Sequence, residues 1–322
     1  YIFQSVLFFL LFFPSFVQGK CKKSQSNTLI ILFHGLGNRA ASFNTMKKKL
    51  EQAFPTASVV ALSSAEGMKS ISASIEEQTE INFEELSTKV KDLAQKSMIL
   101  IGHSQGGLRA YAFLRKYRHL NVKGLVALAT PWEGVPGARV DVEMLSHHLT
   151  APVLNDLRKL SLDLGYAETD LEKKLILNVQ TNQAVCLCPG AKDLIEGSTF
   201  LCEVKKSLPN LPVPILAIGG GQTDFSALLT NRKRYHFKAL NDMYTFLVVG
   251  KKQHYHDMQI PLYSQHALNI LPKKNYNFKR VLIKDAFHST HVLEVPVPKY
   301  KAMLEHPCVL RAVIQFAKAI VK

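Results

Sequence analysis

The hydrophobic positions of the chain gather into short continuous runs, and segments with a helical spacing of apolar residues separate these runs. Seven runs are apolar and β-prone, and they span residues 28–33, 58–62, 98–101, 122–130, 213–218, 244–249 and 280–283. Runs of this kind are typical of strands that are buried on both faces of a parallel sheet. Because they alternate with helical segments, they predict an α/β fold with a mostly parallel central sheet and helices on both of its faces.

Residues 133–210 break this alternation, because they contain a leucine-rich helical pattern and no clear strand. Apolar side chains recur there at a helical spacing, at Val153, Leu154, Leu157, Leu160 and Leu164. We predict that about residues 133–210 form a helical insertion over the sheet. The insertion is either a lid with an apolar inner face or a cap that only shapes a pocket.

The first residues differ from the rest of the chain. Residues 6–13 are VLFFLLFF, and Val17-Gln18-Gly19 then precede the basic Lys20. A membrane-spanning helix needs about 20 apolar residues, so this run is short for a span. Small residues before Lys20 fit a signal-peptide cleavage site. We therefore predict that residues 1–19 are a signal peptide and that the protein is exported, either secreted or periplasmic. The alternative is an uncleaved leader that keeps the protein at a membrane.

The composition limits the class of protein. The chain has 322 residues, of which 47% are hydrophobic, and this excludes an intrinsically disordered or fibrous protein. Chains of this length often form about two domains. Because the insertion accounts for the extra length, we expect one domain over residues 20–322.

The net charge is +15, from 40 Lys plus Arg and 25 Asp plus Glu. Residues 225–322 carry most of it, with 16 Lys plus Arg and 5 Asp plus Glu, a net charge of +11. Such a charge attracts anionic partners. There is no zinc-finger spacing, aromatic RNA-binding signature or glycine-rich phosphate loop, so we expect no nucleic-acid partner. An anionic membrane surface remains a candidate partner, and the sequence leaves the oligomeric state open.

Five cysteines are present, and Cys186, Cys188 and Cys202 fall in one segment. In an oxidising compartment, a bridge from Cys186 or Cys188 to Cys202 is expected, and the sequence leaves the pairing open. Metal binding is disfavoured, because Cys-x-Cys lacks the paired spacing of a structural zinc site. No metal and no organic cofactor are implied.

The main chemical signal is MILIGHSQGG at residues 98–107. It places Ser104 between a predicted strand and a predicted helix, with Gly102 and Gly106 on either side. A serine on such a strained turn, a nucleophile elbow, needs glycines two positions away, because a Cβ there would collide with the strand and the helix. The helix N-terminus also favours negative charge near Ser104. Ser104 is therefore the predicted nucleophile.

The segment FHGLG at residues 33–37 ends the first predicted strand beside this elbow. We expect the backbone N–H groups of Leu36 and Gln105 to form an oxyanion hole, since neighbouring glycines let the main chain approach a reacting carbonyl. His34 and His103 are expected to be structural and to form hydrogen bonds within their loops.

These motifs resemble those of α/β-hydrolase lipases, in particular bacterial secreted triacylglycerol lipases and esterases. The matching segments are FHGLG at 33–37, GHSQGG at 102–107, GLVALATPWEGVPGA at 124–138 and PGAKDLIEGSTFL at 189–201. The first half, with HGLG, Met46 and SQGG, is also similar to palmitoyl-protein thioesterases. The resemblance implies the α/β-hydrolase fold and a catalytic triad in the chain order Ser, Asp, His.

That order directs the search for the acid. Asp257, in HYHDMQIPLYSQ, follows the predicted strand 244–249, and its loop resembles the lipase pattern D-G-x-V-P-x-x-S, with Met258 in place of the glycine. Asp224 is the competitor, since it follows the predicted strand 213–218 in a glycine-rich turn.

The base is expected after the last predicted strand, in KDAFHSTH. His288 fits the usual short distance from the strand end, with His291 as the alternative, and His306 is expected at the surface or as a helix cap. The predicted function is hydrolysis of carboxylic esters of lipids by a Ser–His–Asp acyl-enzyme mechanism. The alternatives are a protein or lipid acyl-thioesterase and an inactive homologue that binds a lipid or a partner.

Overall fold

The computed structural model describes residues 27–229, 236–250, 255–272, 275 and 277–321. The predicted signal peptide, residues 1–19, lies outside the described residues, as does Cys21. No helix within the described part of the chain is both long and apolar enough to cross a membrane.

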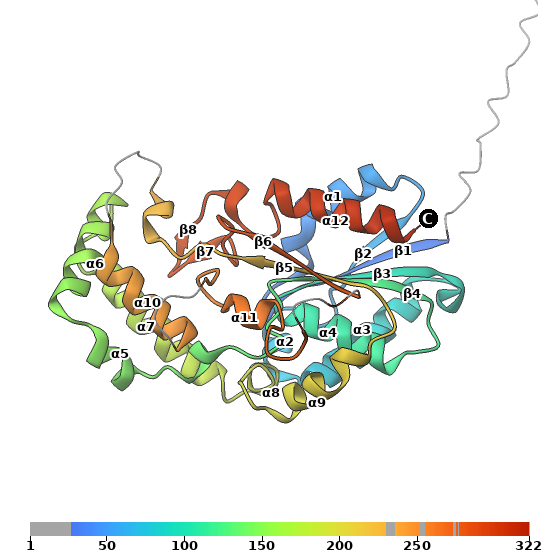
Figure 1. Ribbon diagram of the computed structural model, residues 1–322, viewed down its shortest axis with the longest axis horizontal. Coiled ribbons are helices and arrows are strands. Elements are labelled where there is room, and N and C mark those ends of the chain that lie inside the picture. Colours follow the sequence, from blue (N-terminus) through green and yellow to red (C-terminus); the bar gives the residue numbers. More distant parts are fainter. Residues whose placement is uncertain (1–26, 230–235, 251–254, 273–274, 276, 322) are drawn as a thin grey trace, which may run out of the picture.

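A six-stranded sheet forms the centre of the molecule (Figure 1). Its strands are β1 (Thr28–Phe33), β2 (Ser58–Ala61), β3 (Ser97–His103), β4 (Val122–Leu128), β5 (Ile215–Gly220) and β6 (Phe278–Ile283). They lie in the order β2-β1-β3-β4-β5-β6, and every neighbouring pair is parallel. The predicted α/β architecture with a parallel sheet is confirmed.

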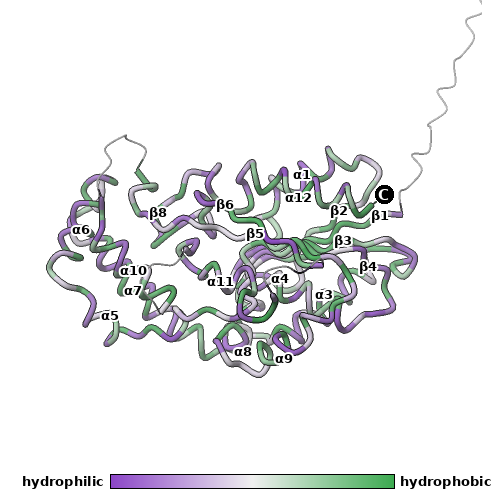
Figure 2. Tube along the Cα trace, in the orientation of Figure 1, coloured by the Kyte–Doolittle hydropathy of each residue, from purple (hydrophilic) through white to green (hydrophobic). Residues whose placement is uncertain are grey.

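Helices cover both faces of the sheet, which explains the continuous apolar runs. Helices α1 (Asn44–Ala53) and α12 (Pro307–Ile320) lie on one face, and α3 (Ile75–Lys89) and α4 (Gln105–Lys116) lie on the other (Figure 1). In β1, alternate side chains belong to the two cores: Leu29, Ile31 and Phe33 pack with α4, and Ile30 and Leu32 pack with α1 and α12. Figure 2 shows the resulting apolar centre between more polar outer helices.

Six of the seven apolar runs are strands, and the prediction for residues 244–249 is wrong. They form the end of α10 (Lys238–Val249), which stops at Gly250 with φ +72°. Leu240, Met243 and Leu247 are buried on one face of this helix, where α6 (Ala151–Asp163) packs against it. A short apolar run fits a strand or a buried helix equally well, and here the packing partner favours the helix.

Residues 133–210 are helical as expected, but they divide into two parts. Helices α5 (Val142–His148), α6 and α7 (Asp170–Val185) pack with α10 in a separate apolar cluster at one end of the molecule (Figure 1). Helix α9 (Thr199–Ser207) instead buries Phe200, Leu201 and Val204 in the same core as α4. Only the first part extends beyond the sheet.

Short elements join these layers: α2 (Met68–Ser72), α8 (Pro189–Lys192), α11 (Leu262–Gln265), β7 (His291–Val292) and β8 (Val295–Pro296), with 3-10 turns at Ala40–Phe43, Leu93–Gln95, Pro136–Arg139, Leu208–Asn210, Phe225–Leu228 and Lys299–Lys301. His306 caps the N-terminus of α12 by accepting a hydrogen bond from the Cys308 N–H.

The predicted local disulfide is wrong, because Cys186, Cys188 and Cys202 are all free thiols. Cys186 lies at the C-terminal end of α7 and Cys202 is exposed on α9. The two helices belong to different apolar clusters, so closeness in sequence does not bring these thiols together.

Candidate active site

Ser104 lies on a strained turn between β3 and α4, with φ +56° and ψ −129°. A non-glycine residue in such a region costs about 1–3 kcal/mol, which the surrounding structure must offset. A Cβ on Gly102 would lie 2.3 Å from the Gly106 carbonyl oxygen, and one on Gly106 would lie 2.0 Å from the Phe33 carbonyl oxygen. The Ser104 N–H donates to the Leu128 carbonyl at 2.8 Å. The glycines therefore permit the turn, and the end of β4 holds it.

The loop after β1 approaches this turn closely. A Cβ on Gly35 would lie 3.0 Å from the Ser104 Cβ. Leu36 and Ser104 line the same cavity. Gln105 is the first residue of α4, so its backbone N–H has no acceptor within the helix. The two N–H groups predicted for an oxyanion hole thus belong to segments that meet at Ser104.

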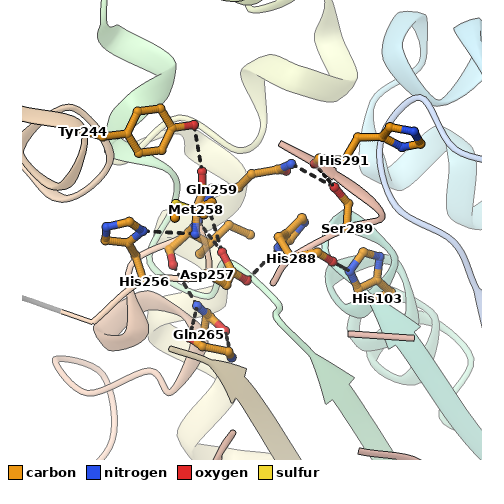
Figure 3. A network of polar contacts seen from close by, with 12 residues as sticks. His103, Tyr244, His256, Asp257, Met258, Gln259, Gln265, His288, Ser289 and His291 are labelled. Atoms are coloured by element: carbon orange, nitrogen blue, oxygen red, sulfur yellow. Dashed lines mark hydrogen bonds and ion pairs between the residues drawn. The ribbon is translucent and has the colours of Figure 1, made fainter. Parts of the chain in front are cut away.

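Asp257 and His288 are in direct contact in the buried interior. The Asp257 Oδ2 lies 2.7 Å from the His288 Nδ1, and the His288 N–H donates to the Asp257 carbonyl at 2.8 Å. Asp257 Oδ1 accepts hydrogen bonds from the N–H groups of Gln259 (3.1 Å) and Ile260 (2.8 Å). Figure 3 shows Asp257 between His288 and the turn of its own loop. With Nδ1 on the carboxylate, Nε2 is the ring nitrogen of His288 left for the cavity that Ser104 also lines.

Asp224 and His291, the alternative candidates for the carboxylate and the base, form their hydrogen bonds with other residues. Asp224 accepts hydrogen bonds from the Ser226 N–H at 2.9 Å and hydroxyl at 2.5 Å, and from the Asn241 amide at 3.0 Å. It caps a turn, with no histidine among these partners. His291 is exposed at the cavity rim, and its Nδ1 lies 3.1 Å from the Thr290 hydroxyl. The structure brings Asp257 and His288 together, and it leaves Asp224 and His291 outside that pair.

Gln265 fixes the loop that carries Asp257, and sequence reasoning missed this contact. Its side-chain Nε2 donates to the Ile260 carbonyl at 2.7 Å, and its Oε1 accepts from the Gly220 N–H at 2.8 Å. A Cβ on Gly220 would lie 2.8 Å from the Asp257 Cβ. Asp257 therefore follows α10 along the chain but lies against the end of β5 in space. The glycine run at residues 219–221 was the one signal in the sequence for this close approach.

His103 contacts His288 from the other side, and the expectation that it forms hydrogen bonds within its own loop is wrong. Its Nε2 lies 3.0 Å from the His288 carbonyl oxygen, and the two ring centroids are 4.8 Å apart. Burial, together with the charge that His288 would carry, lowers the pKa of His103 well below its usual value. His103 is therefore neutral, and its Nε2–H donates to the His288 carbonyl.

Arg109, on α4, anchors the loop that follows β1, and sequence reasoning also missed it. This fully buried guanidinium donates from Nη2 to the His34 carbonyl and from Nη1 to the Asn82 amide oxygen at 3.3 Å. Burial lowers the pKa of Arg109 to about 9. Burial and the nearby Arg109 charge lower the pKa of His34 to about 4, so His34 is neutral at pH 7.

Ser104 and His288 open onto a cavity of about 590 Å³, a volume typical of small-molecule sites. Its apolar wall includes Val135, Leu194, Tyr244, Ile260 and Leu293. Elsewhere in the described residues there is no cluster of three or more His, Cys, Asp or Glu side chains that could hold a metal ion.

Comparisons with solved structures agree with this fold. A lipase from Bacillus licheniformis, BlEst2, is 12% identical over 90% of this chain and 91% of its own, with a TM-score of 0.52. The chain has the α/β-hydrolase fold. A metagenomic carboxyl esterase, MGS0156, shares this fold, at 13% identity over 92% of this chain and 77% of its own, with a TM-score of 0.50.

Sequence comparison adds the palmitoyl protein thioesterase family, whose model matches residues 29–174 of this α/β-hydrolase. No curated protein matches the chain significantly. The chain spans 45% of phospholipase PlaB from Legionella pneumophila, with 10% identity over 74% of this chain and a TM-score of 0.45. The likenesses to BlEst2 and MGS0156 show the fold of the chain.

Proposed function

We propose that the protein hydrolyses carboxylic esters of lipids through an acyl-enzyme on Ser104, with His288 as the general base and Asp257 as the carboxylate that orients it. One observation carries this proposal: the strained Ser104 shares a cavity with His288, whose Nδ1 lies 2.7 Å from Asp257. A serine hydroxyl needs an adjacent base, and the base needs a carboxylate that fixes its tautomer.

The reaction has two steps. His288 Nε2 takes the proton of Ser104 Oγ as the oxygen attacks the ester carbonyl, and the Leu36 and Gln105 N–H groups stabilise the oxyanion. His288 then donates this proton to the leaving alcohol, which leaves Ser104 acylated. A water molecule, deprotonated by His288, releases the acid and restores Ser104. Asp257 stabilises the imidazolium that forms in each step.

A second candidate is an acyl-thioesterase. The match of residues 29–174 to the palmitoyl protein thioesterase family favours it, and the same triad serves both reactions. A thiolate leaves without a general acid more readily than an alkoxide. A site adapted to thioesters would therefore cleave them faster than oxygen esters of equal chain length.

The test combines active-site labelling with a substrate series. We expect a fluorophosphonate probe to label the wild type, and we expect Ser104→Ala to abolish labelling and turnover of ester and thioester substrates of increasing chain length. Asp257→Asn and His288→Ala should lose most activity, whereas the matched controls Asp224→Asn and His291→Ala should retain it. Full activity in Ser104→Ala would overturn the mechanism. A folded wild type with neither labelling nor turnover would favour an inactive homologue that binds a lipid or partner.

We also propose that the protein is exported and works at an anionic lipid surface. The apolar run at residues 6–13 and the net charge of +15 support this. Expression in an export-competent host, followed by N-terminal sequencing of the exported protein, tests it, and a mature N-terminus at Lys20 is expected. A product confined to the cytoplasm would contradict export.

A further inference from the structure

The described residues that line the active-site cavity include no Asp, Glu, Lys or Arg, although these four residue types make up 20% of the chain. The histidines that the described wall contains are His103, His288 and His291. The wall reaches Ser104 and His288, so this uncharged surface surrounds the reacting bond. It contrasts with the net charge of +15 on the whole chain.

The polar side chains of this wall, apart from the histidines, are mainly neutral amides and hydroxyls. They are Asn38, Asn178, Asn182, Gln259, Ser289 and Thr290. Asn178 and Asn182 lie one turn apart on α7, where the Asn182 amide donates to the Asn178 side-chain oxygen at 3.2 Å. In another part of the wall, the Gln259 amide donates to the Ser289 hydroxyl at 3.3 Å. Amides and hydroxyls offer both donors and acceptors, so this surface can pair with a polar group of either kind.

A charge close to the cavity is neutralised by a partner. Lys174 precedes Asn178 by one turn of α7, and its Nζ lies 2.7 Å from a carboxylate oxygen of Glu294. Glu294 is the neighbour of Leu293, which lines the cavity. The ion pair leaves no net charge from these two residues near the wall.

We propose that the site selects substrates whose leaving group is uncharged and hydrogen-bonding, and that it discriminates against leaving groups with a charge beside the scissile bond. The selection rests on the acyl-hydrolase activity proposed above. Apolar wall residues such as Tyr244, Ile260 and Leu293 accommodate the acyl chain, and the amides and hydroxyls bind the leaving group. A charged group would lose part of its hydration without meeting an opposite charge among the described wall residues, and neutral amides compensate that loss poorly.

Two sources provide such a leaving group: an acylglycerol, through its hydroxyls, and an S-acyl peptide, through its backbone amides. The experiment uses one acyl chain with six leaving groups. The oxygen esters are octanoyl glycerol, octanoylcholine and octanoyl lactate. The thioesters are S-octanoyl N-acetylcysteine amide, S-octanoyl N-acetylcysteine and S-octanoyl thiocholine.

At an ionic strength of about 0.15 M, where long-range steering is screened, we expect kcat/KM for the neutral member of each set to exceed that of its charged partners by about tenfold or more, a difference of about 1.4 kcal/mol in transition-state binding. Equal or faster turnover of the charged members would overturn the selection. The neutral substrate with the higher kcat/KM, octanoyl glycerol or S-octanoyl N-acetylcysteine amide, shows whether the leaving group comes from a glycerol ester or a peptide thioester. If none of the six substrates is cleaved, the proposed activity itself fails.

Charged variants of the wall give an independent test. Asn182→Lys should raise kcat/KM for the anionic substrates relative to the neutral ones, and Asn182→Asp should do the same for the cationic ones. Asn155→Lys is the matched control, because Asn155 is exposed on α6 and is not part of the wall. An identical change in preference for Asn182→Lys and Asn155→Lys would attribute the effect to net charge and would contradict a role for the wall.

Discussion

His103 links the two loops that carry the proposed nucleophile and base. It precedes Ser104 in the chain and donates to the His288 carbonyl at 3.0 Å. We expect His103→Phe to lower kcat by about fivefold, because the lost hydrogen bond of about 1 kcal/mol no longer holds His288 in position, with KM nearly unchanged. His103→Gln retains an N–H donor and should recover much of kcat. Equal kcat values for the Phe and Gln variants, with unchanged pH profiles, would exclude this positioning role.

Asp257 and Asp224 provide a matched pair for the acid. Asp257→Asn leaves His288 without the carboxylate that fixes its tautomer, and we expect kcat to fall by about 10³–10⁴-fold. Asp224→Asn weakens a turn cap and should cost about 1 kcal/mol of stability with little change in kcat. Steady-state kinetics and thermal unfolding of both variants test this. A larger loss of kcat in Asp224→Asn than in Asp257→Asn would reverse the assignment.

At the scale of elements, the elbow depends on the contact between α4 and the end of β1. We expect Gly106→Ala to destabilise the protein strongly, because its Cβ would lie 2.0 Å from the Phe33 carbonyl oxygen. Gly137→Ala is the control, since the nearest atom to its Cβ would be 3.5 Å away and its φ is not positive. Urea unfolding of both variants measures their free energies of unfolding. A Gly106→Ala protein as stable as Gly137→Ala would contradict the close contact.

The elements differ in how far the sequence predicts them. Continuous apolar runs identify β1 and β3, because both faces of these strands are buried and no polar position interrupts them. Residues 244–249 form a similar apolar, β-prone run, yet they are helical and pack against α6. The turn at Ser104 can be predicted from its local sequence, because a Cβ at Gly102 or Gly106 would collide with neighbouring backbone. The placement of Asp257 depends on Gln265 and the end of β5, contacts between distant segments that no local pattern encodes.

At the scale of the whole molecule, the chain keeps several histidines neutral in its interior while its net charge is +15. His34, His103, His256 and His266 are all buried. Their burial follows from the fold and not from their neighbours in sequence, so the sequence could identify His288 by chain order but could not separate the rest by role. The consequence is a stability that depends on pH.

Burial lowers the folded-state pKa of His34, His256 and His266 to about 4, against about 6.5 in an unfolded chain. Between these values the unfolded state binds more protons, so the free energy of unfolding falls as pH decreases from 6.5 towards 4. Each histidine contributes on the order of 3 kcal/mol over that window. Urea unfolding at several pH values should therefore show a midpoint that declines below pH 6.5.

His256→Gln separates one of these contributions. Glutamine can still bond to the Thr245 hydroxyl and the Met258 N–H, the two groups that His256 contacts at 3.0 Å, but it does not titrate. We expect its slope of unfolding free energy against pH to be smaller than that of the wild type by up to about 1.4 kcal/mol per pH unit within the window. Identical slopes would mean that His256 has the same pKa folded and unfolded, and that water reaches it in the native state.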